Sequence, residues 1–136
     1  MNDLERLIAI EEIKRLKARY FYGIDNKDWE LWRREVWAPD ARLIVGEMGK
    51  DVGPRDVLID WVAAQSADQV SVHHGHMPDI EIVSDTEATG VWAMEDLIWR
   101  SKEHSSTANM PMSTAGGTTA SAMSNWTWAG VFSRPS

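Results

Sequence analysis

The chain has 136 residues, 43% of them hydrophobic, and a formal net charge of −7. This length suits one compact domain that buries its own core. The acidic balance argues against nucleic acid or an anionic membrane as a partner, because both need a basic protein surface. The absence of cysteine excludes a disulfide framework and thiolate metal chemistry.

The first residues are charged and lack the apolar stretch of a signal peptide, and no apolar run approaches the roughly 18–20 residues needed to span a bilayer. We therefore expect a soluble, cytoplasmic protein. Eight tryptophans are many for this length. They suit a pocket for a bulky, ring-shaped ligand, although simple core filling accounts for most of them.

Residues 3–23 are predicted to form an amphipathic helix. Asn2, with Glu5 three residues later, gives a capping-box start, and Gly23 is the expected stop. The charged side chains, Lys17 among them, are expected mostly off the apolar face. That face comprises Leu4, Leu7, Ile8, Ile13, Leu16, Tyr20 and Phe21.

Two shorter helices are predicted next. The first opens at Asp28 and ends at Pro39, and the second begins at Pro54. Between them, residues 41–45 alternate like a strand and turn at residues 46–49. The inward side chains of the two helices are Trp29, Trp32 and Val36 in the first, and Val57, Leu58, Trp61 and Val62 in the second.

The hydrophobic period changes after residue 69. Residues 70–76, 79–83 and 88–100 predict three strands, with a turn at residues 84–87. The two faces of the longest strand carry Gly90, Trp92, Met94, Asp96 and Ile98 on one side, and Val91, Ala93, Glu95, Leu97 and Trp99 on the other. Helices followed by strands favour the α+β class over a doubly wound sheet.

The last quarter of the chain has a different composition. Residues 101–136 contain three charged side chains, whereas the first 100 residues contain 32. Of these 36 residues, 21 are Ser, Thr, Ala or Gly, which leaves few large side chains to anchor an element. We therefore divide the chain into a domain, residues 1–100, and an atypical tail, residues 101–136, expected to be disordered or a loose loop. The tail side chains able to dock are Trp126, Trp128, Val131 and Phe132.

Four stretches within residues 4–100 resemble the SnoaL-like superfamily. They are IEEIKRLKARYF (10–21), DNKDW (25–29), HHGHMP (73–78) and ATGVWAMED (88–96). The specific part of the resemblance is Tyr20, Asp25 and His73 at matching spacing. Within the superfamily the chain looks most similar to the bile acid 7α-dehydratase branch, with scytalone dehydratase and hexachlorocyclohexane dehydrochlorinase as more distant relatives of the same type.

The resemblance implies the cone-shaped α+β fold also seen in nuclear transport factor 2, in which a curved antiparallel sheet wraps around a long N-terminal helix and encloses a deep pocket. It also implies elimination, isomerisation or cyclisation by side chains alone, without metal or other cofactor, in a homodimer or homotrimer. After Trp99 the family pattern continues with two long strands, and this sequence departs from that pattern. One explanation is a frameshifted reading of a GC-rich gene, and the other is a natural flexible tail. Resequencing the DNA around codons 100–112 distinguishes the two.

The chemistry of the three residues suits elimination next to a carbonyl. The imidazole of histidine ordinarily titrates near pH ~6.5, so its basic form is available at pH 7, and we assign His73 as the base. Asp25 would orient the imidazole and stabilise the imidazolium. Tyr20 would donate a hydrogen bond to the carbonyl oxygen, a contribution of about 2–4 kcal/mol.

Structural roles remain open for the same residues. Tyr20 on an apolar helix face suits a core, and Asp25 suits a cap on the next helix. His74 and His76 point the same way on a strand, a spacing that suits a metal chelate, but the sequence places no third ligand. Asp96 suits a second acid, a partner for an arginine, or a solvated edge.

The sequence therefore predicts a cofactor-independent lyase or isomerase, dehydratase-like, for a small hydrophobic cyclic ligand. Its predicted substrate-pocket residues are Trp29, Trp61, His74, Trp92 and Asp96. The alternatives are a non-catalytic protein of the same fold that binds a hydrophobic ligand, and a scaffolding subunit that uses an exposed sheet face.

Overall fold

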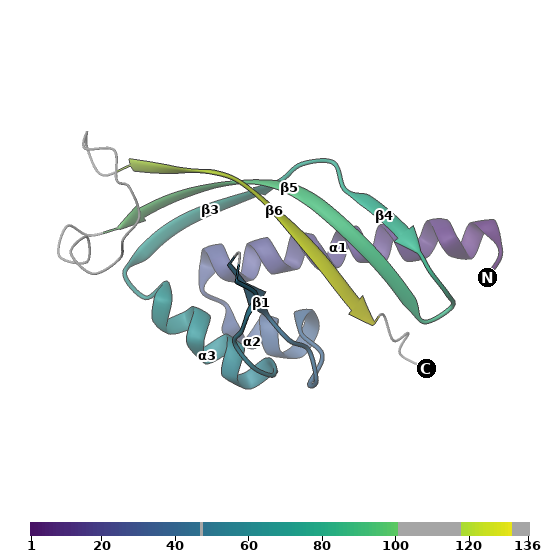
Figure 1. The fold of residues 1–136 in the computed structure, drawn as a ribbon, viewed down its shortest axis with the longest axis horizontal. Helices are drawn as coiled ribbons and strands as arrows, with labels where there is room; N and C mark the ends of the chain where they lie inside the picture. The colour runs from purple at the N-terminus through teal and green to yellow at the C-terminus, as the bar shows by residue number, and fades with distance from the viewer. Residues whose placement is uncertain (47, 101–117, 132–136) are drawn as a thin grey trace.

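The computed structural model describes residues 1–46 and 48–100 in full, and the backbone of residues 118–131. Figure 1 shows a curved sheet lying over the long helix α1, with the short helices on the side of α1 away from the sheet. The elements in chain order are α1 (Asp3–Asn26), α2 (Trp29–Leu31), the π-helix η1 (Trp32–Val36), β1 (Ile44–Val45), β2 (Lys50–Asp51), α3 (Arg55–Gln65), β3 (Gln69–Gly75), β4 (Asp79–Ile82), β5 (Glu87–Arg100) and β6 (Thr118–Val131).

The larger sheet is organised around β5. The strands β3 and β4 both pair antiparallel with β5, β3 opposite residues 94–100 and β4 opposite residues 88–91. β6 also pairs antiparallel with β5, and its register shifts between Met94 and Asp96. This curved antiparallel sheet on N-terminal helices confirms the predicted α+β class.

The three strands predicted at residues 70–76, 79–83 and 88–100 are confirmed within one residue at each end. The predicted tail is only partly described: residues 118–131 form β6, while residues 101–117 and Phe132 lie outside the described residues. Whether the tail reflects a change of reading frame stays a prediction.

The start of α1 is confirmed. Asn2 accepts a hydrogen bond from the backbone N–H of Glu5, and the Glu5 carboxylate accepts one from the backbone N–H of Asn2, which completes the capping box. The apolar face was predicted less well. Leu4 and Leu7 are 66% and 62% exposed. The buried positions in the first half of α1 are Ile13, as predicted, and Ala9, which was not predicted.

The predicted stop at Gly23 is wrong, because α1 continues to Asn26 and ends at Lys27 in the left-handed conformation (φ 54°). Gly23 is needed for another reason. A Cβ placed there would lie 2.3 Å from Cδ1 of Trp32, so only glycine lets the indole ring approach the helix this closely.

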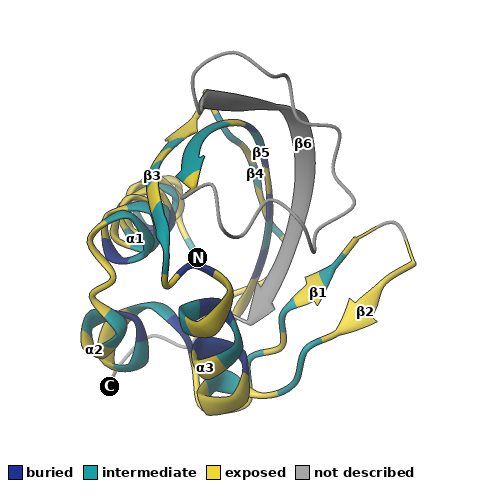
Figure 2. Ribbon diagram, turned by 90° about the vertical axis from the view of Figure 1, so that its left-hand side faces the viewer, coloured by how far each residue is buried: buried dark blue, intermediate teal, exposed yellow. Residues whose placement is uncertain are grey.

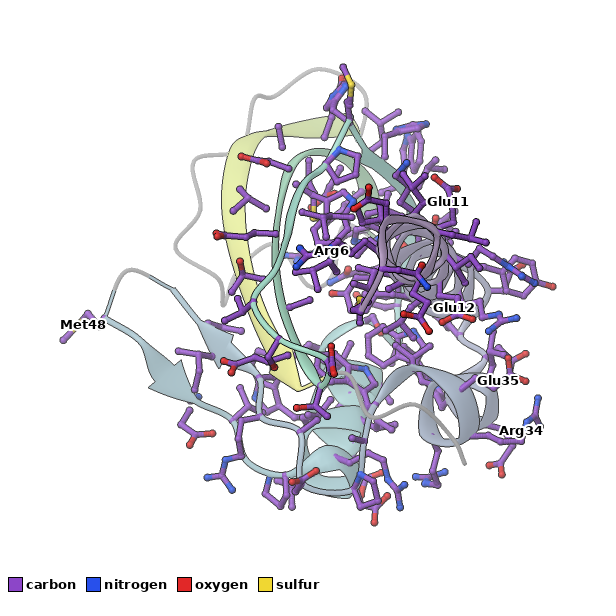
Figure 3. The ribbon with its side chains drawn as sticks, turned by 90° about the vertical axis from the view of Figure 1, so that its right-hand side faces the viewer. Arg6, Glu11, Glu12, Arg34, Glu35 and Met48 are labelled. Carbon is purple, nitrogen blue, oxygen red and sulfur yellow. The ribbon has the colours of Figure 1, made fainter. Side chains whose placement is uncertain are left out.

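The short helices follow the sequence with some differences. Asp28 caps α2 because its carboxylate accepts a hydrogen bond from the backbone N–H of Leu31. In α3 the predicted Val57 is 52% exposed, and Ile59 takes its place among the buried residues. The strand expected at residues 41–45 shortens to β1, which pairs with β2 across a turn containing Gly46 and Gly49. Met48 stands at the tip of this hairpin and points into solvent (Figure 3).

The buried side chains form two clusters. Figure 2 marks the buried residues in dark blue along the ribbon. We call the first the aromatic core: Trp32, Trp37, Leu58, Ile59 and Val62. Its partly buried neighbours come from the end of α1, from the three other helical elements and from the segments that flank the β1–β2 hairpin. We call the second the inner-face cluster: Ile13, Ala88, Trp92 and Met94, with Phe21, Ile80 and Ile82 against it. The inner-face cluster lies between α1 and the sheet, and the site described next borders it.

Candidate active site

The last turn of α1 meets the middle of β3 through Asp25 and His73. Oδ1 of Asp25 lies 2.5 Å from Nδ1 of His73, although 48 residues separate the two in sequence. Both side chains are largely buried, with 20% and 9% of their surfaces exposed. The structure thus places in direct contact two of the residues that the sequence singled out.

Further hydrogen bonds fix the Asp25 carboxylate. Its Oδ1 accepts from the Ser71 hydroxyl at 2.9 Å, and its Oδ2 accepts from the backbone N–H of His73 at 3.0 Å. Because an ionised carboxylate only accepts, the proton of a neutral His73 ring resides on Nδ1, and Nε2 presents a lone pair. Ser71 was not foreseen. It shares a face of β3 with His73, two residues away, and that spacing was its sequence signal.

Asp96 stands opposite His73 in the β3–β5 register. Oδ2 of Asp96 lies 4.0 Å from Nε2 of His73, while Oδ1 is buried and receives no hydrogen bond within the described residues. Burial raises the pKa of the Asp96 carboxyl, and the charge of Asp25 adds to the rise, while His73 and Lys17 oppose it. A carboxyl with a raised pKa beside an imidazole is typical of a proton-transfer site.

Lys17 lies near Asp96 and the aromatic rings of the site. The sequence had placed it among the charged side chains off the apolar face of α1. Its Nζ sits 4.2 Å from the ring centroid of Tyr20, 5.1 Å from that of Phe21 and 5.5 Å from that of Trp92. Burial lowers the pKa of Lys17 to about 8, and the charge of Asp96 opposes the decrease. Its sequence signal was the spacing of three and four residues to Tyr20 and Phe21, which puts all three on one helix face.

Tyr20 connects the site to the aromatic core. Its ring stacks on Trp32 at a centroid distance of 4.9 Å and meets Trp37 edge-on at 5.9 Å. Burial raises the pKa of the Tyr20 phenol well above its usual value, and the carboxylates of Asp96 and Asp25 raise it further. Tyr20 therefore stays protonated and can act only as a neutral hydrogen-bond donor near neutral pH.

The five predicted pocket residues divide into two groups. Trp92 is buried in the inner-face cluster, on the same face of β5 as Asp96. Trp29 and Trp61 pack instead against the aromatic core, where Trp29 meets Trp32 edge-on. His74 is exposed, because successive residues of a strand face opposite ways and His73 faces inward. The structure therefore brings Trp92 and Asp96 to the contacting pair of Asp25 and His73, which we call the dyad, and not Trp29, Trp61 or His74.

The metal chelate considered for His74 and His76 gains no further ligand. In the part of the chain that the structure describes, no group of three or more His, Cys, Asp or Glu side chains is arranged to hold a metal ion. The second imidazole, that of His76, lies 3.9 Å from the Glu95 carboxylate on the exposed side.

The family model of the SnoaL-like domain matches residues 5–129. The chain belongs to the SnoaL-like family. A variant of a protein of unknown function from Mycobacterium tuberculosis has a TM-score of 0.71 and 20% identity, over 96% of this chain and 68% of that one. The family's fold is thus confirmed, and the family match extends beyond residue 100 into the predicted tail.

Two further structures of the same fold carry names of enzymes. A hexachlorocyclohexane dehydrochlorinase from Novosphingobium barchaimii has a TM-score of 0.64 and 16% identity, over 99% of this chain and 100% of that one. A protein described as a scytalone dehydratase from Novosphingobium aromaticivorans has a TM-score of 0.64 and 15% identity, over 96% and 92% of the two chains. At these identities the likeness concerns the fold alone.

Among the described residues, no helix is both long and apolar enough to cross a membrane. The cytoplasmic location stays a prediction.

Proposed function

We propose that this chain is a cofactor-independent lyase or isomerase that performs a dehydratase-like elimination on a bulky hydrophobic cyclic substrate. The observation that carries the proposal is the contact of 2.5 Å between Asp25 Oδ1 and His73 Nδ1, beside the apolar inner-face cluster. Membership of the SnoaL-like family supports the reaction type, as do the names of the dehydrochlorinase and the scytalone dehydratase.

His73 is the base in this proposal. Its Nε2 takes a proton from the carbon next to the substrate carbonyl, and the electron pair of that C–H bond forms the new double bond as the leaving group departs. The imidazolium that results is stabilised by Asp25, whose two other hydrogen bonds hold the carboxylate in place.

Tyr20 is the electrophile. Because its pKa is raised, the phenol keeps its proton and can donate a hydrogen bond to the carbonyl oxygen as negative charge develops there. One such donor in a water-poor site contributes about 2–4 kcal/mol to transition-state stabilisation.

The apolar character of the substrate is inferred from the rings around the dyad. Phe21 lies almost parallel to the His73 ring, with 6.3 Å between centroids and 12° between planes. Trp92 is buried beside them. Flat aromatic walls favour a cyclic, hydrophobic ligand over a chain of polar groups.

The test replaces His73 by alanine and measures elimination across a panel of β-substituted cyclic ketones. We expect turnover to fall by about 10²–10⁴-fold, the usual contribution of a general base, with ligand affinity kept within about tenfold. His76→Ala, an exposed imidazole on the same segment, is the matched control and should keep full activity. Unchanged turnover in the His73 variant would remove the base assignment.

A homo-oligomer forms part of the proposal, and apolar residues on the outer face of the sheet support it. Val70, Val72 and Val91 are 65%, 37% and 41% exposed, on the face opposite His73 and Asp96. A scaffolding subunit that used this face would need the same surface. Sedimentation of the unchanged chain beside a Val70→Lys, Val72→Lys double variant tests the assignment, and identical molar masses would contradict it.

A further inference from the structure

Lys17 is a partly buried cation that the reaction proposed above does not use. Its ammonium lies over the rings of Tyr20, Phe21 and Trp92, and no described carboxylate lies within ion-pair distance of it. Aromatic faces attract a cation but accept no proton from it. The ammonium group therefore keeps its donors available for a ligand on the inner face of the sheet.

We propose that Lys17 is the acid that protonates the leaving group, so that the substrate of this site loses a hydroxyl group as water. This inference rests on the proposed function and specifies its substrate as a β-hydroxy carbonyl compound on a ring. The geometry behind it is the position of the ammonium over the rings of Phe21 and Trp92. Phe21 lies almost parallel to the His73 ring, and Trp92 shares a face of β5 with Asp96, whose carboxylate lies 4.0 Å from Nε2 of His73.

The proton balance closes within these groups. Nε2 of His73 takes the proton from carbon, the C–H electron pair forms the double bond, and the C–O bond breaks with its electrons on oxygen. The departing oxygen takes a proton from Nζ of Lys17 and leaves as water. His73 has then gained one proton and Lys17 has lost one. When the product leaves, His73 releases its extra proton to solvent and Lys17 takes one up, which restores the starting state of both groups.

The surroundings of Lys17 suit an acid that works near neutral pH. Among the described residues, the titratable groups that face Lys17 are Tyr20 of α1, whose ring lies under its ammonium, and Asp96 of β5, whose charge acts on its pKa. Asp25, His73 and His74 act in turn on Asp96, and the sequence of β6 contains no titratable residue. With its pKa at about 8, Lys17 is still protonated at pH 7 and releases its proton more readily than an exposed lysine. Leaving groups that depart as stable anions need no such proton.

The experiment compares two probes that differ only in their leaving group. The first is the bicyclic β-hydroxy ketone 3-hydroxy-1-tetralone, which yields 1-naphthol after loss of water, and the second is its acetate ester, which loses acetate. In Lys17→Met we expect turnover of the hydroxy ketone to fall by about 10²–10³-fold. Turnover of the acetoxy ketone should stay within about threefold. The decline in hydroxy-ketone turnover above about pH 8 should disappear in the variant.

The control is Lys14→Met, on the same helix, where Lys14 is exposed and paired with Glu11 at 2.6 Å. It should change neither rate. Equal losses on both probes in Lys17→Met would indicate a packing role and overturn the inference, as would unchanged turnover of the hydroxy ketone. The inference would also be overturned if the protein without substitutions converted the acetoxy ketone but not the hydroxy ketone. In that case the effect of His73→Ala on the acetoxy ketone would still test the proposed function separately. Thermal unfolding of each variant confirms that the folded protein is being compared.

Discussion

The aromatic core and the inner-face cluster bury similar kinds of side chain but differ in the charges beside them. Lys50, which lies over Trp61 at the edge of the aromatic core, is exposed. Lys17 and Asp96, beside the inner-face cluster, are partly buried, and burial is the leading cause of both their pKa shifts. Apolar surroundings stabilise the fold in both regions, and beside the inner-face cluster they also shift the pKa values of these two charged side chains.

The largest expected effect is that of Asp25→Asn on turnover. This substitution distinguishes a role of Asp25 in orienting His73 from a role in stabilising the fold. In Asp25→Asn the amide can no longer act purely as an acceptor for Nδ1–H, so the imidazole loses its fixed tautomer. We expect turnover to fall by about 10³–10⁴-fold. The measurement is kcat/KM beside urea denaturation.

Asp28→Asn is the matched control for that substitution. Asp28 caps α2 through the backbone N–H of Leu31, and asparagine caps a helix about as well. Its activity and stability should stay close to those of the unchanged chain. Comparable losses in the two variants would mean that Asp25 is merely structural.

The aromatic core should show the opposite pattern, a large loss of stability. Trp32 is fully buried, and its indole N–H donates to the Tyr20 carbonyl at 2.9 Å. Trp32→Ala leaves a cavity and removes the indole hydrogen bond to that carbonyl, which we expect to lower the free energy of unfolding by about 3–5 kcal/mol. Trp29→Ala, at a partly buried position in the same region, should lower the free energy of unfolding by less. A larger loss in Trp29→Ala than in Trp32→Ala would contradict the placement of Trp32 at the centre of the aromatic core.

Gly23 tests how closely α1 and the aromatic core approach each other. Alanine is favoured over glycine in a helix by about 1 kcal/mol, but its Cβ would meet Trp32 at 2.3 Å. We expect the clash to dominate and Gly23→Ala to be destabilised by about 1–3 kcal/mol in urea titrations. A variant more stable than the unchanged chain would show that the indole moves away at little cost. Ala18→Gly, at an exposed position of α1, calibrates the helix-propensity term.

The sequence predicted the dyad better than it predicted its surroundings. Asp25 and His73 were found because their spacing resembles a known pattern. The positions of Lys17 and Gly23 depend on where the sheet and Trp32 lie against α1. Those positions come from tertiary packing, which helical periodicity does not contain. The predicted inward face of α1 therefore wrongly included Leu4 and Leu7, which are exposed.

His74 and the tryptophans illustrate the same limit. Strand alternation already separates His74 from His73, so its assignment to the pocket conflicted with the predicted strand. Trp29, Trp61 and Trp92 were indistinguishable by type and periodicity. They were divided by the packing of η1 and α3, which gathers the first two into the aromatic core.

The smallest expected effect, on stability, concerns Lys17 again. Its pKa is about 8 in the folded chain and 10.5 ordinarily. Between those pH values the unfolded chain binds more protons, so the free energy of unfolding rises with pH. Solvent reaches part of this side chain, so we expect the rise to be about 1 kcal/mol, well below the full value of the shift. Lys17→Met should lose the rise in urea titrations between pH 7 and 10, whereas Lys50→Met should keep it because Lys50 is exposed. If the free energy of unfolding still rises with pH in Lys17→Met, another titrating group causes the rise. The difference between the aromatic core and the inner-face cluster would then not come from Lys17.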